Sequence, residues 1–230
     1  MTKRPSQIAI DGPASSGKTS VGKRLAQRLG YLFFDTGLVY RAAAVAALNG
    51  GETLPESDEI VRRVRAMTFE LRNDPSGSET RIFLNQRDCS DLLHLPVIDA
   101  NVSTVAALPE VRALLTSQQR QIGRRGSAVL VGRDIGTVVL PDAELKIFLL
   151  ASTEVRARRR QAENIANGID TTYESVLKNI QQRDENDSKR AVAPLIAASD
   201  AIQIDTDDLD LEGVERLRSE ERRVGKECRS

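Results

Sequence analysis

The chain has 230 residues, and its 33 basic and 33 acidic side chains give a formal net charge of zero at pH 7. A balanced chain has no overall field that attracts a nucleic-acid backbone or an anionic membrane surface, so we expect neither as a partner. Two cysteines and one histidine exclude a disulfide framework and argue against a His-based triad or a zinc site. There is no long apolar run and no signal-peptide pattern at the N-terminus, so the cytoplasm is the expected compartment. The even charge balance and the lack of a long apolar heptad make a monomer the expected state.

The first motif is a glycine-rich segment that follows the apolar residues 8–10. Gly12 and Gly17 are separated by four residues and followed by Lys18 and Thr19, which is the spacing of a P-loop. Such a loop turns successive N–H groups around a phosphate, at the positive end of the next helix. Lys18 is suited to the β- and γ-phosphates and the Thr19 hydroxyl to Mg²⁺. The alternative is a glycine-rich turn that binds nothing.

Alternating strand and helix patterns predict a parallel α/β sheet with helices on both faces. Strands are expected at residues 8–10, 31–34, 128–131, 146–150 and 201–205. Helices are expected from Lys18 to a cap at Gly30, at 39–48, at 59–66 with Ser57 or Asp58 as cap, at 109–123, after Ser152 or Thr153, at 173–187 and at 211–217.

Two segments depart from this alternation, and they predict an inserted subdomain and a lid. Residues 68–72 and 81–85 alternate with period two around a turn cluster, which predicts a hairpin in an inserted antiparallel subdomain. The stretch 156–190 is strongly charged and poor in large apolar residues, which favours a helical lid. The expected organisation is core at 6–39, 106–155 and 191–218, insertion at 40–105, lid at 156–190, and a disordered, possibly non-native tail at 219–230.

Three polar clusters follow the predicted strands or lie in the charged stretch. Thr36 and Arg41 come after the second strand, at the sheet edge where ligands bind in α/β folds, although Arg41 could instead pair with Asp35. Arg133 and Asp134 end the strand at 128–131 and could hold a second substrate or form a structural salt bridge. The charged stretch offers a set that could neutralise a phosphoryl group or form a solvated face: Arg156, Arg160, Arg183, Asp187 and Arg190.

Five segments together resemble the bacterial cytidylate kinase (CMP kinase) family, a group of P-loop nucleoside monophosphate kinases. They are GPASSGKT, DTGLVYRAAA, NVSTVAALPEVR, GRDIGTVVLPDAELKIFLLAS and RDENDSKRAVAPL, in order over residues 6–218. The resemblance implies direct in-line transfer from ATP, with Mg²⁺, to CMP or dCMP, giving ADP and CDP or dCDP. It also implies a five-stranded parallel sheet, an inserted monophosphate-binding subdomain and a lid.

The resemblance also implies residue roles. It assigns catalytic roles to Lys18, Arg133, Arg160 and Arg183. It assigns ATP binding to Gly12, Pro13, Ala14, Ser15, Ser16, Gly17, Lys18 and Thr19, and makes Thr19 the metal ligand. It assigns CMP binding to Thr36, Arg41, Ser103, Arg112, Arg133, Asp134, Arg183, Asp187 and Arg190. Thr36 stands where the family often has serine, which keeps the hydroxyl but adds a methyl group.

Two other readings compete with this one. Another small-molecule P-loop kinase, of the adenylate or shikimate kinase type, shares the P-loop but does not account for the hairpin or the GRDIGT segment. A P-loop nucleotide switch is expected to carry a guanine-selecting Asn-Lys-x-Asp segment, which this sequence lacks.

Overall fold

The computed structural model describes residues 4–73 and 80–208 of the chain. The chain divides into two compact units, Met1–Phe34 with Gly123–Ser230 and, inserted between these segments, Asp35–Ile122. The predicted closing helix at 211–217 and the tail at 219–230 lie outside the described residues. No helix in the described ranges is both long enough and apolar enough to cross a membrane.

The first unit is built on the predicted five-stranded parallel sheet. Its strands are β1 (Gln7–Asp11), β2 (Leu32–Asp35), β6 (Ala128–Gly132), β7 (Leu145–Leu150) and β8 (Ile202–Asp205). Their order is β2-β6-β1-β7-β8, so β1 lies at the centre with parallel neighbours on both sides. The fold class expected from the alternating pattern is therefore confirmed, with strand ends within a residue or two of those predicted.

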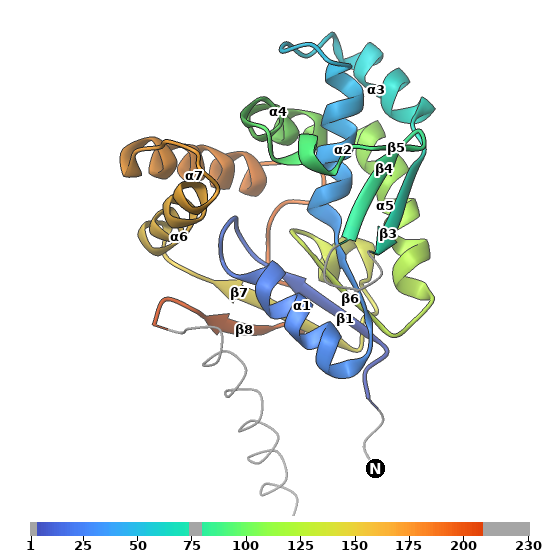
Figure 1. Ribbon diagram of the computed structural model, residues 1–230. Coiled ribbons are helices and arrows are strands. Elements are labelled where there is room, and N and C mark those ends of the chain that lie inside the picture. The colour runs from blue at the N-terminus through green and yellow to red at the C-terminus, as the bar shows by residue number, and fades with distance from the viewer. Residues whose placement is uncertain (1–3, 74–79, 209–230) are drawn as a thin grey trace, which may run out of the picture. The chain divides into compact units, whose positions relative to one another are not determined.

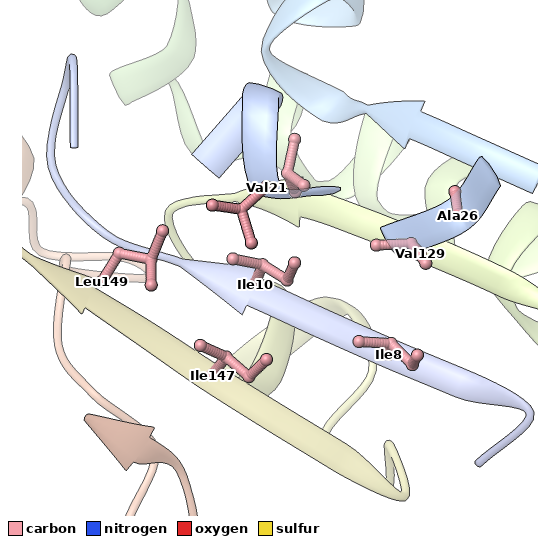
Figure 2. Close-up of a cluster of buried hydrophobic side chains, with 8 residues drawn as sticks. Ile8, Ile10, Val21, Ala26, Val129, Ile147 and Leu149 are labelled. Carbon is pink, nitrogen blue, oxygen red and sulfur yellow. The ribbon is translucent and has the colours of Figure 1, made fainter. Parts of the chain in front are cut away.

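One side of this sheet is covered by α1 (Lys18–Leu29), as Figure 1 shows. The helix ends at Gly30, whose φ of 69° is the left-handed conformation that a glycine cap adopts without strain. Val21 and Ala26 face a cluster of branched side chains from three strands, among them Ile8, Ile10, Val129, Ile147 and Leu149 (Figure 2). This dry core fixes α1 on the sheet, and with it the loop between β1 and α1.

Two helices follow β7 and lie side by side in Figure 1: α6 (Thr153–Ala166) and α7 (Tyr173–Ser188). Of the two candidate caps of α6, Ser152 is the one observed, since its Oγ accepts a hydrogen bond from the Val155 N–H. A small apolar cluster of Ala157, Val176 and Ile180 joins the helices. The charged stretch is thus helical, and it has a core of its own.

The second unit is mainly helical. Its helices are α2 (Thr36–Leu48), α3 (Ser57–Ala66), the 3₁₀ helix η1 (Ser90–His94), α4 (Pro96–Ala107) and most of α5 (Pro109–Arg124). The predicted hairpin is confirmed as β3 (Phe69–Asn73) antiparallel to β4 (Thr80–Leu84), and the short β5 (Arg87–Asp88) adds an unpredicted third strand.

Three local predictions in this unit need correction. The sequence patterns predict no element at residues 96–107, where the structure has helix α4. Its β-branched residues have low helix propensity, but Ile98, Val102 and Val105 are buried at helical spacing. Helix α2 begins at Thr36 rather than Val39, since Asp35 accepts a hydrogen bond from the Gly37 N–H and caps the helix. The N-cap of α3 is Glu56, so neither Ser57 nor Asp58 is its cap.

Candidate functional site

The loop between β1 and α1 has the backbone that the P-loop spacing predicts. Gly12 has a φ of 149°, and a Cβ placed there would lie 2.3 Å from the carbonyl oxygen of Leu149. Gly17 is the N-cap of α1 with a φ of 91°, and Ser15 also has a positive φ, 58°. The two glycines therefore stand where a side chain would clash or strain the loop.

The start of α1 is suited to an anion. Its first turn, which lies within the described part of the chain, has neither an acidic residue nor a side-chain cap, so the dipole of the helix is not offset there. Lys18 is only 7% exposed, and its Nζ donates a 2.6 Å hydrogen bond to the carbonyl oxygen of Pro13. The ammonium group thus lies folded against the loop, and Thr19 beside it is exposed.

A buried carboxylate, Asp11, ends β1 immediately before the loop. Its Oδ1 accepts a 2.8 Å hydrogen bond from the Ile135 N–H, and its Oδ2 accepts a 2.7 Å bond from the Gly136 N–H. Burial raises the pKa of Asp11 to about 6, with a further contribution from the Asp134 charge, against the lowering effects of the two N–H groups and of Lys18. The carboxylate is therefore held by backbone donors in a site that disfavours its charge.

The raised pKa of Asp11 predicts a particular pH dependence of stability. Between the unfolded value of 3.8 and about 6 the folded protein binds the proton more tightly, so the stability contribution of this group falls as the pH rises. In an Asp11→Asn variant this dependence is absent. We expect the free energy of unfolding of wild type, relative to the variant, to drop by up to about 3 kcal/mol from pH 4 to pH 7, measured by urea denaturation. A flat difference would contradict the assignment.

Arg133 connects the loop to α7. Its Nη1 donates to the carbonyl oxygen of Gly12 at 3.2 Å, and its Nε donates to Oδ2 of Asp187 at 2.8 Å. Arg190 lies on the other oxygen of Asp187, at 3.7 Å. Burial raises the pKa of Asp187, but the charges of Arg133, Arg190 and Arg183 outweigh burial and hold it below its ordinary value. Three predicted site residues, all arginines, therefore act on the carboxylate of a fourth, Asp187.

Arg156 has a different place from the other arginines of the charged stretch. It is 3% exposed, and its two terminal nitrogens donate to the two carboxylate oxygens of Asp184 on α7, at 3.0 and 2.5 Å. It also donates to the carbonyl oxygens of Ala14 in the loop and Ala151. Arg160, one turn further along α6, pairs with the exposed Glu163 at 3.0 Å. The cluster thus separates into a buried arginine and one at the surface.

Of the remaining predicted substrate-binding residues, Asp134 is buried in the first unit, and the others lie in the second. Arg41 donates to the carbonyl oxygen of Leu93 at 2.6 Å and pairs with Asp99 at 2.5 Å. Arg112 is buried, donates to the Ala106 carbonyl oxygen at 3.2 Å and lies over the Tyr40 ring, 5.2 Å from its centroid. The last two are the buried Thr36 on α2 and the half-buried Ser103 on α4.

The chain is similar to known proteins over nearly its whole length. The cytidylate kinase family model matches residues 8–219. The chain belongs to that family. Proteins named cytidylate kinase are 47% identical in Ligilactobacillus salivarius, over 90% of this chain and 92% of that protein, and 46% identical in Streptococcus mutans over the same shares. The relative from Lactiplantibacillus plantarum is 43% identical over 93% of both chains. The family resemblance predicted from the sequence is thus confirmed.

A solved shikimate kinase from Bacteroides thetaiotaomicron aligns with 94% of this chain and 98% of its own, with a TM-score of 0.48 and 15% identity. That likeness is too weak to bear on the assignment.

Two residues of the site in this family member were missed by sequence reasoning. Asp11 could have been found, because a carboxylate at the end of an otherwise apolar central strand must be satisfied by nearby donors. Asp184 had no such signal, since α7 carries four acidic residues and nothing in the sequence says which of them faces Arg156.

Proposed function

We propose that the protein transfers the γ-phosphoryl group of ATP to CMP, giving ADP and CDP, and that dCMP is a second acceptor. Membership of the cytidylate kinase family makes it a nucleoside monophosphate kinase, a transferase. The match over residues 8–219 is the observation that carries the proposal. The P-loop supports it, because the loop offers two glycines at positive φ, a helix start and a buried lysine to a phosphate.

ATP would be bound by the loop from Gly12 to Thr19. On binding, the Lys18 ammonium would exchange its contact with the Pro13 carbonyl oxygen for the β- and γ-phosphates. Thr19 is an exposed residue in the first turn of α1, and a threonine hydroxyl at this point of a P-loop fits a ligand of Mg²⁺. The described residues contain no cluster of three metal-binding side chains, and Mg²⁺ commonly takes one or two protein ligands together with phosphates. The ion would neutralise charge on the phosphates.

CMP would be held by the residues that the family resemblance names for it. We assign its phosphate and ribose to Thr36, Arg41 and Arg133, and its base and sugar to Ser103, Arg112, Asp134 and Asp187. Arg183 and Arg190 would add positive charge from the proposed lid at 156–190, and Arg160 would assist at the migrating phosphoryl group. Several of these arginines are already paired with carboxylates, so a phosphate would compete with Asp99 for Arg41 and with Asp187 for Arg133.

The acceptor oxygen of CMP belongs to a phosphate that is already anionic, so no strong general base is needed. Catalysis then depends on in-line positioning of the two phosphates and on neutralisation of the charge that spreads over the transferred group. This requirement suits a chain whose candidate site is rich in arginines and contains one lysine. It also agrees with a sequence that has a single histidine.

The same proposal includes the partners of the enzyme, its compartment and its oligomeric state. The partners would be the small nucleotides themselves, with neither nucleic acid nor membrane involved, and the enzyme would act in the cytoplasm as a monomer. The zero net charge supports this part of the proposal, since it provides no overall attraction to a polyanion.

The test is release of ADP from ATP and Mg²⁺ with CMP, dCMP, UMP, AMP or shikimate supplied separately. Turnover with CMP and dCMP far above the other acceptors is expected. Equal ADP release with no acceptor would overturn the kinase assignment in favour of a hydrolase or switch. Activity with AMP or shikimate alone would keep the phosphoryl transfer and overturn the acceptor.

A further inference from the structure

The buried carboxylate of Asp11 has no role in the phosphoryl transfer described above. It does not face the loop as a free acceptor, because both of its oxygens are taken up by the N–H groups of two consecutive residues, Ile135 and Gly136. These residues open the short π-helical turn Ile135–Val139, directly after Arg133 and Asp134. A bond from each oxygen to adjacent residues fixes the position and also the direction of the backbone at this point.

The same stretch is confined from other directions. A Cβ at Gly136 would lie 3.2 Å from Cδ of Lys146 and 3.4 Å from Oδ2 of Asp11, so the backbone passes closely between the two, and a side chain there would make a tight contact with Lys146. Lys146 cannot readily move away, because its Nζ donates to both oxygens of Asp200 at 2.9 and 2.8 Å. The turn is therefore held between β1 and β7.

The other end of the stretch is tied to the same strand. In the sheet, Asp11 pairs with Gly132, the residue before Arg133. The Arg133 guanidinium then donates to the carbonyl oxygen of Gly12. Asp134 thus lies between two attachments to the end of β1, one through Arg133 and one through the Asp11 carboxylate. Because β1 also leads into the P-loop, one strand end sets the position of both segments.

We propose that Asp11 is a positioning residue, whose carboxylate fixes the Arg133–Asp134 segment against the P-loop strand and so sets the affinity for the phosphoryl acceptor. The part concerning the acceptor rests on the proposed function. Enzymes hold such groups to fractions of an ångström, and a shift of the segment would misplace Arg133 and Asp134 together. ATP binding depends on the loop itself, which Asp11 does not contact through its carboxylate in the bonds described above.

The experiment compares wild type with Asp11→Asn and with Ile8→Val as a matched control. Asparagine keeps the shape but can accept through one oxygen only, so one buried N–H loses its partner. Ile8 is fully buried in the same strand, and its change to valine removes a methylene group without touching either N–H. Asp11→Asn is expected to raise the KM for CMP about tenfold and to lower kcat, while the Kd of a non-hydrolysable ATP analogue changes less than about threefold.

A readout that needs no turnover separates this inference from the proposed function. Amide hydrogen exchange at Ile135 and Gly136 is expected to be about tenfold faster in Asp11→Asn than in wild type, and unchanged in Ile8→Val. If wild type did not phosphorylate CMP, the exchange rates would still show whether the carboxylate anchors the turn. Unchanged exchange would overturn the anchoring.

Two further outcomes would overturn the positioning role. One is faster exchange with an unchanged KM for CMP, and the other is an equal rise of that KM in Ile8→Val, which would make lost stability the cause. If Asp11→Asn does not fold, Gly136→Ala serves instead. It leaves the carboxylate intact but crowds the Lys146 side chain, so the turn or that side chain must shift by a few tenths of an ångström, and a rise in KM for CMP in the same direction is expected.

Discussion

A Lys18→Met variant is expected to retain about one thousandth of the wild-type kcat with ATP and CMP. Lys18 contributes the only lysine ammonium in the loop from Gly12 to Thr19, and burial to 7% exposure means that water screens its charge poorly. Methionine fills the same space without the charge, so the fold is preserved while charge developing on the transferred phosphoryl group loses its counter-ion. The measurement is steady-state ADP release at saturating concentrations of both substrates.

The control is Lys23→Met on the same helix. Lys23 is exposed, and its Nζ lies 5.9 Å from the centroid of the Phe33 ring. Its replacement is expected to leave kcat unchanged, and urea denaturation of both variants checks that neither effect comes from unfolding. A Lys18→Met enzyme with more than about a tenth of wild-type kcat would contradict a direct role at the transferred phosphate.

Much of the fold could be predicted from the sequence because its signals are local. The five strands are apolar runs that end in glycine or polar residues, and the P-loop combines a strand, two glycines and a helix within a dozen residues. Helix α4 shows where such signals fail. Its Val102, Thr104 and Val105 resemble strand residues, and the buried face that makes the segment a helix depends on packing that only the folded unit provides.

The sequence allowed the residues of the candidate site to be proposed, but it did not indicate which of them form ion pairs with one another. Sequence position places Arg133 at the end of a core strand, and the family resemblance names Asp187, but nothing in the chain says that the two meet at 2.8 Å. The same limit applies to Arg156 and Arg160, which differ by one helical turn and look alike in the sequence. Only the folded structure distinguishes the buried partner of Asp184 from the surface partner of Glu163.

This distinction predicts opposite consequences for the two arginines. Arg156→Met is expected to lower the free energy of unfolding by about 3 kcal/mol, because it leaves the Asp184 carboxylate and the carbonyl oxygens of Ala14 and Ala151 without a buried donor. Arg160→Met is expected to change it by less than about 0.5 kcal/mol, since Glu163 in this pair is 56% exposed and water screens the interaction. Urea denaturation at neutral pH measures both.

The double variant Arg156→Met with Asp184→Leu decides whether the pair or the arginine alone carries the effect. Removing both charges leaves no uncompensated ion, so the loss should be smaller than the sum of the two single losses by about 2 kcal/mol. Steady-state kinetics should separate the two variants further. Arg160→Met should lower kcat without changing the free energy of unfolding, whereas the main effect of Arg156→Met should be a lower free energy of unfolding. Additive losses in the double variant would mean that Arg156 does not act through Asp184. A stable Arg156→Met protein with greatly reduced kcat would instead place Arg156 at the reacting phosphates.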